Sequence, residues 1–189
     1  MPPVCFADVL FVDLDGTLVA TDVMRRALGM AVRRQPWELV VFLASALKGR
    51  AMAKRALARR LRPDPRQLPY HAEVLAFLRA EKARGVPVVL ATASDRLWAE
   101  PIAHYVELFN DVLASDGGRN LKGVGKLNAI QTYCRERGFG AFAYIGDAMA
   151  DVPIWEQAAQ VYAVAPARRV WAALQTFSQP VYVFTPSSS

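Results

Sequence analysis

The chain has 189 residues, of which 53% are hydrophobic and 21% are charged, with a net charge of +6. This length and composition fit one globular domain of ordinary size with room for a small insertion. The two cysteines, Cys5 and Cys134, lie far apart, which favours reduced, buried thiols in a cytosolic protein. No Cys and His residues cluster at zinc-binding spacing, since His71 and His104 stand in no such context.

The N-terminal residues show neither a basic leader nor a long apolar stretch. In the first half of the chain, the longest uncharged segment is Leu39–Leu47, which has nine residues. A membrane-spanning helix needs about 20 apolar residues. We therefore expect a cytoplasmic protein that does not span a membrane.

In chain order, short apolar runs predict strands and the segments between them predict helices. The expected elements are the strand Val9–Asp13, a helical insert, the helix Glu73–Arg84, the strand Val86–Ala91, the helix Leu97–Val106, the strand Asp111–Ala114, the helix Lys126–Arg137, the strand Phe142–Ile145, the helix Pro153–Ala159 and the strand Val161–Val164. Strands that alternate with helices of this length favour parallel pairing with right-handed crossovers, hence a doubly wound α/β sheet. Such sheets bind ligands outside the carboxyl ends of their strands.

The insert is also where the positive charge is concentrated. Residues 22–70 hold twelve Lys or Arg against three acidic residues, whereas the rest of the chain holds eleven against fourteen. We expect a small all-helical cap, 22–69, inserted into a core of 1–21 and 70–189. In the helix expected over Arg50–Leu61, one set of positions forms an apolar face and a second, basic set points elsewhere. The apolar set is Met52, Ala53, Ala56, Leu57 and Leu61, and the basic set is Lys54, Arg55, Arg59 and Arg62.

Two carboxylates, Asp13 and Asp15, follow the first apolar run, and Gly16 is where the chain must turn out of the strand. Carboxylates crowded at the end of a buried strand repel each other and cost desolvation energy. A fold tolerates this arrangement when a cation or a reacting phosphate lies between them. The alternative is a strand that ends in a solvated Asp-x-Asp-Gly turn.

Two further polar positions fall at a strand end and a helix start. Thr92 follows the second strand, so its hydroxyl and nearby amides, including that of Ala93, are expected at the strand tip, although threonine is also a routine helix cap. Lys126 opens a helix after Gly123 and Gly125. A lysine there opposes the helix dipole and is favourable only if an anion also lies at that end. A solvated surface lysine is the alternative.

The segment from Gly146 to Asp151 is the strongest of these signals, because an apolar strand runs into Gly-Asp-x-x-x-Asp. Gly146 would let the backbone approach a ligand, and Asp147 supplies an oxygen ligand at the strand tip. Asp151 follows one turn later, close enough to bind or orient the same ion. A small set of oxygen ligands suits Mg²⁺, which takes its remaining ligands from water and substrate phosphate.

The order Asp-x-Asp, Thr, Lys and Gly-Asp-x-x-x-Asp, each piece at a strand end, resembles the haloacid dehalogenase (HAD) superfamily over nearly the whole chain. The resemblance implies a Rossmann-like, three-layer fold with a cap, similar to the phosphoserine-phosphatase-like branch. Three sequence segments look like those of HAD domains fused to UbiA-type prenyltransferases: Leu90–Asp95, Ala114–Gly117 and Ala150–Trp155. One departure is the apolar run Ala148–Ala150, where many relatives carry polar residues, so Asp151 must supply the orienting contacts.

The resemblance also implies a mechanism for phosphate ester hydrolysis. Asp13 would attack phosphorus and become a transient aspartyl phosphate, while Asp15 would act as general acid and then general base. The implied phosphate-binding residues are Thr92, Ala93, Lys126 and Gly16. The implied Mg²⁺ ligands are Asp13, Asp147 and the backbone carbonyl of Asp15. Asp151 would orient these ligands without binding the metal itself. An acid at position 15 argues against cleavage of carbon–halogen or carbon–phosphorus bonds.

Other interpretations of the motifs were weighed. A P-loop would need glycine at position 120 and Ser or Thr at 127, where the chain has Asn120 and Leu127. A response-regulator receiver places its phospho-accepting Asp before the Thr, whereas here Asp147 follows Lys126. A non-catalytic anion- or membrane-binding module that partners a prenyltransferase system is the alternative function, since the basic cap with Trp37 could rest on an anionic lipid surface.

The expected ligand is a small-molecule phosphate ester. The basic cap favours a substrate with further anionic charge, and the prenyltransferase resemblance suggests a polyprenyl-linked phosphate. Nucleic acid is not an expected partner, because aromatic residues do not alternate with the basic ones. Contact of the cap with a membrane surface remains open at this stage.

Overall fold

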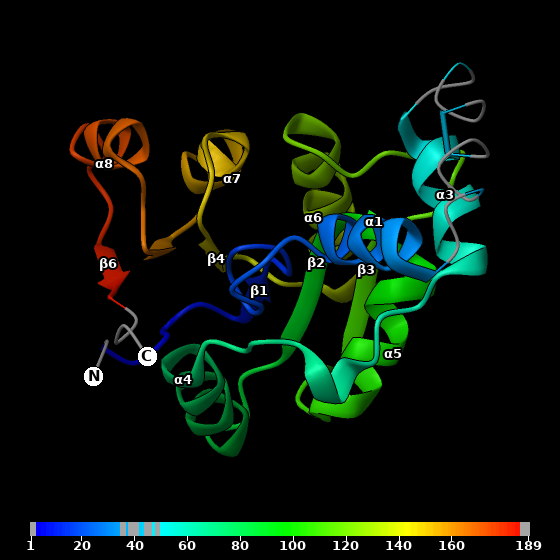
Figure 1. Ribbon diagram of the computed structural model, residues 1–189. Helices are drawn as coiled ribbons and strands as arrows, with labels where there is room; N and C mark the ends of the chain where they lie inside the picture. The colour runs from blue at the N-terminus through cyan, green and yellow to red at the C-terminus, as the bar shows by residue number, and fades with distance from the viewer. Residues whose placement is uncertain (1–2, 35–36, 38–41, 44–46, 48–49, 186–189) are drawn as a thin grey trace.

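Six parallel strands form a single sheet. The computed structural model describes residues 3–34, 37, 42–43, 47 and 50–185. The strand order is β3-β2-β1-β4-β5-β6 (Figure 1). The strands are β1 (Val9–Val12), β2 (Val88–Asp95), β3 (Asp111–Ser115), β4 (Phe142–Gly146), β5 (Gln160–Val164) and β6 (Val181–Phe184). The order reverses at β1, whose neighbours are β2 and β4, so the ligand-binding crevice of such a sheet lies outside their carboxyl ends.

Helices cover both faces of this sheet. Helices α4 (Ala72–Ala83) and α5 (Arg96–Val106) lie on one side, and α6 (Val124–Arg137), α7 (Val152–Trp155) and α8 (Arg168–Leu174) lie on the other (Figure 1). Side chains alternate along β1, so Leu10 and Val12 pack on the side of α4 and α5, whereas Phe11 packs on the side of α6 and α7. The predicted Rossmann-like, three-layer α/β fold is confirmed.

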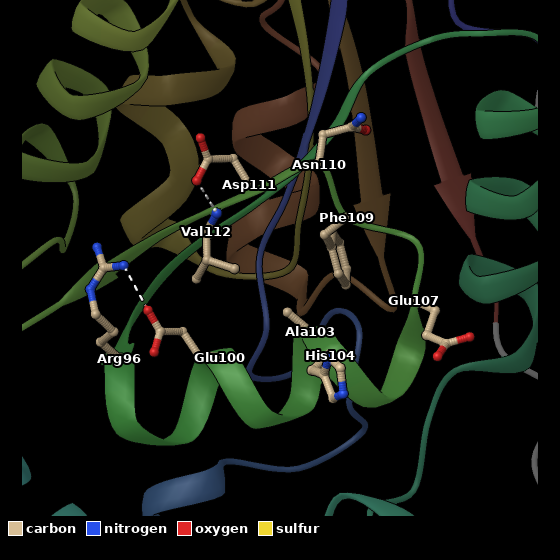
Figure 2. Close-up of a pocket in the computed structure, with 9 residues that line it drawn as sticks. All are labelled: Arg96, Glu100, Ala103, His104, Glu107, Phe109, Asn110, Asp111 and Val112. Atoms are coloured by element: carbon tan, nitrogen blue, oxygen red, sulfur yellow. Dashed lines mark hydrogen bonds and ion pairs between the residues drawn. The ribbon is translucent and has the colours of Figure 1, made fainter.

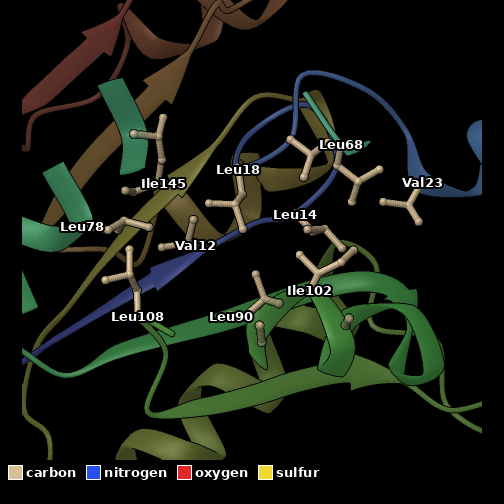
Figure 3. Packing of buried hydrophobic residues seen from close by; sticks show 14 of the residues in the cluster. Val12, Leu14, Leu18, Val23, Leu68, Leu78, Leu90, Ile102, Leu108 and Ile145 are labelled. Atoms are coloured by element: carbon tan, nitrogen blue, oxygen red, sulfur yellow. The ribbon is translucent and has the colours of Figure 1, made fainter. Parts of the chain in front are cut away.

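The loop that follows β1 is held in place by the same apolar core. Leu14 and Leu18 are fully buried and continue the packing of β1 toward Val23 and Leu68 (Figure 3). The loop closes on itself through hydrogen bonds from the Leu18 amide to the Asp13 carbonyl and from the Val19 amide to the Leu14 carbonyl. The two carboxylates beyond β1 therefore project from a fixed loop rather than from a solvated turn.

The regular elements of the insert, in the part that the structure describes, are helices. The insert holds α1 (Val23–Arg34), α3 (Arg50–Arg60) and the short 3₁₀ helix η1 (Pro65–Gln67). The uncharged segment 39–47 lies largely outside the described residues. The boundaries of the cap, residues 22–69, stay a prediction.

Helix α3 differs from its predicted orientation. Met52, assigned to the apolar face, is 44% exposed, whereas Ala58 is buried. Lys54 and Arg55 lie off the apolar face, as predicted, but they contact the core: the first donates to the Ala93 carbonyl at 2.9 Å and the second pairs with Asp95 at 3.0 Å. The reason is that α3 packs against α1, α5 and β2 at once, so it has no single buried face.

Several element bounds also differ from the prediction. Strand β2 continues to Asp95, because its pairing with β3 resumes at Ser115 after a register shift. Thr92 and Ala93 therefore lie within a strand rather than after it. The expected helix Pro153–Ala159 is shorter, with η2 (Met149–Asp151) leading into α7. The short elements α8 and β6 were not predicted.

The cysteines and the lengths of the helices bear on two further expectations. Cys5 and Cys134 are both unpaired and buried, as predicted. Within the described part of the chain, no helix combines the length and apolarity that crossing a membrane requires.

Candidate active site

A buried ion pair lies outside the carboxyl ends of β1 and β4. The Lys126 Nζ is 2.9 Å from the Asp13 Oδ1 and 3.2 Å from the Asp151 Oδ1. The Tyr144 hydroxyl lies 2.6 Å from the same Nζ and donates to the Asp151 Oδ1 at 2.8 Å. Asp13 follows β1, Lys126 is in the first turn of α6, Tyr144 is in β4, and Asp151 ends η2. The lysine that seemed unfavourable at a helix start thus has two carboxylates as its anions.

Burial sets the protonation of this pair. Loss of hydration, together with the nearby carboxylates of Asp151 and Asp15, raises the pKa of Asp13 to about 7, although Lys126 lowers it. Burial lowers the pKa of Lys126, but the Asp13 and Asp151 carboxylates raise it more, so it stays above its ordinary value. The lysine is therefore a fixed positive charge beside a carboxylate that ionises near neutral pH.

Asp151 orients the loop that carries Asp147. Its Oδ2 accepts hydrogen bonds from the backbone amides of Asp147 at 3.3 Å and Ala148 at 3.2 Å. The Thr17 hydroxyl donates to the Asp147 Oδ1 at 3.3 Å. Asp151 therefore makes contacts that hold this loop in place. The residues between Asp147 and Asp151 have no polar side chains that could do so.

Gly16 is required by the approach of Asp147. It adopts a φ of +79°, and a Cβ at this position would lie 2.2 Å from the Asp147 Oδ2. Any other residue would therefore be strained in its backbone and would displace the Asp147 carboxylate.

Three carboxylates are close enough together to hold a metal ion. One oxygen from each of Asp13, Asp147 and Asp151 lies within 4.8 Å of the others. Both oxygens of Asp151 already accept hydrogen bonds, so Asp13 and Asp147 are the better placed ligands. Burial and the neighbouring Asp151 raise the pKa of Asp147 to about 6. A small set of crowded oxygen donors, each costly to ionise, fits a hard divalent cation.

The Asp15 carboxylate lines the same cavity but has hydrogen-bonding partners of its own. It accepts a hydrogen bond from the Val23 amide at 2.6 Å, at the N-terminus of α1, and another from the Ser94 hydroxyl. Burial raises its pKa even though both hydrogen bonds lower it. A carboxyl held this way can retain a proton at higher pH than an exposed aspartate, as a general acid must.

A cavity of about 350 Å³ connects these groups. The predicted site residues that line it are Asp13, Asp15, Gly16, Ala93, Lys126, Asp147 and Asp151. Thr92 is not among them, since it is fully buried and its hydroxyl accepts the Ser94 amide at 3.0 Å. The structure thus brings the predicted residues to one cavity, with Thr92 directly behind its wall.

Four residues of the site were missed by the sequence analysis: Thr17, Lys54, Ser94 and Tyr144. Thr17 and Ser94 each lie within two residues of a predicted site residue, so the motifs themselves were a signal. Tyr144 occupies an ordinary apolar strand position, and nothing in its local pattern marks its hydroxyl. Lys54 was predicted only to lie off the apolar face of its helix.

A separate surface hollow, of about 340 Å³, lies at the edge of the sheet beside α5 and β3 (Figure 2). His104 is one of its lining residues. Arg96 pairs with Glu100 at 3.0 Å, and the Val112 amide donates to Asp111. The hollow shares no lining residue with the Asp13 cavity, and we assign it no role in the site.

Comparison with known proteins agrees with this geometry. The family model for haloacid dehalogenase-like hydrolases matches residues 10–156. The uncharacterized protein y4nM of Sinorhizobium fredii (strain NBRC 101917 / NGR234) is 32% identical over 180 residues, which is 95% of this chain. The chain spans 34% of the length of that relative.

Solved structures show the same fold. A protein of unknown function from Bordetella pertussis Tohama I has a TM-score of 0.70 at 17% identity, covering 92% of this chain and 97% of the other. A substrate-bound phosphoserine phosphatase has a TM-score of 0.67 at 12% identity, covering 96% and 94%. These identities are low, so this likeness shows the fold alone. The match of the family model over residues 10–156 carries the assignment: the chain belongs to the haloacid dehalogenase-like hydrolase family.

Proposed function

We propose that the protein is a Mg²⁺-dependent phosphatase that hydrolyses a phosphomonoester through an aspartyl-phosphate intermediate on Asp13. The observation that carries the proposal is the Asp13 carboxylate, held by Lys126 at 2.9 Å in a cavity that also contains Asp15 and Asp147. Phosphoryl transfer requires mainly positioning and neutralisation of charge, and this cavity offers groups for both.

In the first half of the reaction, an Asp13 oxygen forms a bond to phosphorus as the bond to the ester oxygen breaks. The leaving alkoxide takes the proton of Asp15, whose raised pKa favours the protonated form. In the second half, Asp15 accepts a proton from water, which attacks the same phosphorus. Inorganic phosphate leaves, and both carboxyl groups return to their starting states.

The remaining residues position the phosphoryl group. Lys126 faces its oxygens as a fixed positive charge, and the backbone of Ala93 and Gly16 lies along the same cavity. Thr92 supports the cavity wall through the Ser94 amide. Asp13 and Asp147 would hold Mg²⁺, which when bound neutralises charge on the phosphoryl group.

One solved structure of the same fold suggests the chemistry that we propose for this site. It is a phospho-aspartyl intermediate analogue of phosphoserine phosphatase, with a TM-score of 0.66 at 13% identity, covering 96% of this chain and 95% of that chain. The location of Asp13 directly after the first strand of the same fold suggests that it takes the same covalent role here.

The experiment is Mg²⁺-dependent hydrolysis of para-nitrophenyl phosphate by wild-type protein and by Asp13→Asn. We expect the variant to lose at least about a thousandfold in kcat, because it lacks the nucleophile. Asp111→Asn is the matched control, since Asp111 pairs with Arg137 outside the cavity, and it should retain wild-type activity. A folded wild-type protein that is inert with Mg²⁺ on a broad panel of phosphate esters would refute the proposal.

A further inference from the structure

A second cavity of about 420 Å³ adjoins the Asp13 cavity beneath the insert. The two cavities share the lining residues Asp15, Asp22, Lys54 and Lys122. The second cavity is otherwise lined by Met24, Phe42, Ala53, Ser94 and Asn120. Its volume lies within the usual range for small-molecule sites. It therefore offers space beside Asp15, the group that would protonate the departing oxygen.

The walls of this second cavity are mostly apolar on the side of the insert. Met24 comes from α1 and Ala53 from α3, and both they and Phe42 present carbon atoms. An apolar wall stabilises an apolar ligand and makes no hydrogen bonds to a small polyhydroxy alcohol.

Two lysines lie at the junction of the cavities. Neither Lys54 nor Lys122 makes an ion pair with a carboxylate among the residues that the structure describes; Lys54 donates to the Ala93 carbonyl at 2.9 Å. The nearby acids have other partners, because Asp15 accepts from Ser94 and the Val23 amide, and the Asp22 Oδ1 accepts the Arg25 amide at 3.0 Å. The two ammonium groups therefore offer N–H donors to a ligand at the junction, where the Asp15 and Asp22 carboxylates offset part of their positive charge.

We propose that the second cavity receives the alcohol part of the substrate, and that this alcohol is apolar next to the ester oxygen and carries a separate anionic group that Lys54 and Lys122 bind. The inference rests on the proposed function and specifies the substrate class of the same site. It adds no chemical step, because the reacting bonds are those already given for Asp13 and Asp15. A short, neutral alcohol would leave the apolar wall and both lysines without contacts.

The test compares para-carboxybenzyl phosphate with para-carbamoylbenzyl phosphate. The two esters are similar in size, and the methylene group keeps the leaving-group chemistry similar. We expect wild-type kcat/KM to be higher for the carboxyl ester by about tenfold or more, as for a hydrogen bond between charged groups. Equal values for the two esters would overturn the assignment of the lysines.

Variants locate the preference within the structure. Lys54→Met and Lys122→Met should each reduce the carboxyl-to-carboxamide ratio of kcat/KM, and the double variant should bring it near unity. Lys82→Met is the control, since its Nζ donates to the Glu107 carbonyl on a distant part of the core, and it should keep the wild-type ratio. A ratio that survives the double variant would assign the selectivity to other residues and overturn the proposal.

The apolar wall has its own test. Wild-type protein should hydrolyse para-carbamoylbenzyl phosphate with a higher kcat/KM than ethyl phosphate, because only the benzyl group fills the second cavity. Equal kcat/KM values would contradict an apolar leaving-group cavity.

Binding separates failure of this inference from failure of the proposed function. If the wild-type protein hydrolyses none of these esters and is also inert on the broad panel of phosphate esters, the phosphatase proposal fails. Calorimetry with Asp13→Asn and Mg²⁺ decides the inference in either case. Tighter binding of para-carboxybenzyl phosphate than of para-carbamoylbenzyl phosphate would support it, and equal Kd values would overturn it.

Discussion

Two lysines reach the same cavity from opposite sides, and their surroundings differ. Lys126, from the core helix α6, is 3% exposed and contacts Asp13, Asp151 and the Tyr144 hydroxyl. Lys54, from α3 in the insert, is only half-buried, and its hydrogen bond among the described residues goes to the Ala93 carbonyl. A buried charge is tolerated only with partners, whereas a partly solvated charge needs none. The core side of the cavity thus holds its charge in fixed contacts, as the proposed chemistry requires, and the insert side carries the charge that we propose selects the ligand.

The largest expected effect comes from removing a carboxylate on the core side. Asp147→Asn should lower Mg²⁺-dependent kcat/KM by more than about a hundredfold, because a metal ligand is lost. The same change should stabilise the metal-free protein at about pH 8 by up to about 3 kcal/mol, since one costly buried charge is gone. Activity assays with Mg²⁺ and unfolding experiments with a chelator measure the two effects.

The stability gain has a defined pH range. Burial and Asp151 raise the pKa of Asp147 to about 6 in the folded protein, whereas in the unfolded chain the carboxyl has its ordinary value of 3.8. The folded state therefore holds its proton more readily, and metal-free wild-type protein loses stability as the pH rises from about 4 to above 6. The Asn variant lacks this loss, so the two proteins should converge near pH 4. A variant less stable than wild type at pH 8 in chelator would contradict carboxylate crowding.

The next largest effect should come from Tyr144→Phe, which removes one hydroxyl from the core side. Lys126 and Asp151 then lose a shared hydrogen-bonding partner, and we expect kcat/KM to fall by about tenfold with a stability loss of about 1 kcal/mol. Steady-state kinetics and urea unfolding give the two values. The control is Tyr182→Phe on β6, which should leave kinetics unchanged. Wild-type kinetics in Tyr144→Phe would mean that the hydroxyl only fills space.

What the sequence could predict follows the same division between core and insert. Asp13 and Asp147 were found because a buried strand followed by Gly and Asp is a local pattern, and parallel strands bring their carboxyl ends together. Tyr144 could not be found this way, since its strand position is apolar in pattern and its hydroxyl gains its role only from α6 and η2. The fold class needed only the alternation of elements. Helix α8 has seven residues, too few to show a helical period, whereas β6 is an apolar run as long as strands that were predicted and was overlooked.

The contacts of Lys54 and Arg55 with the core were not predicted, for a different reason. Helical periodicity identifies one buried face, but α3 packs against α1, α5 and β2, so several of its faces are covered. The chain near Gly117 also passes close to the stem of Arg55, with 3.1 Å between its Cγ and a Cβ built on the glycine. Such contacts depend on how the insert docks on the core, which no local pattern encodes.

A smaller effect is expected where the insert is joined to the core. Arg55→Met removes the guanidinium that lies 3.0 Å from the Asp95 carboxylate. Asp95 is fully buried, and its carboxylate also caps α5 by accepting a hydrogen bond from the Leu97 amide. We expect a loss of about 1–2 kcal/mol in unfolding free energy, less than for a fully buried pair because Arg55 is 25% exposed. Urea denaturation measures it, and Arg59→Met is the control on an exposed position of the same helix. Equal stability of the two variants would show that the pair contributes nothing.

The smallest expected effect concerns screening of the charges on the insert side. Raising the ionic strength from about 0.05 to about 0.5 M shortens the Debye length and should lower kcat/KM for para-carboxybenzyl phosphate by about two- to fivefold more than for the carboxamide ester. The reason is that salt reaches the half-buried Lys54 and the exposed Lys122, but not Lys126, which both esters meet equally. Kinetics of both esters across the salt range check this difference. If the two esters lose activity in parallel, the salt acts on the phosphoryl group common to both, and the selecting charge does not lie on the solvent side of the cavity.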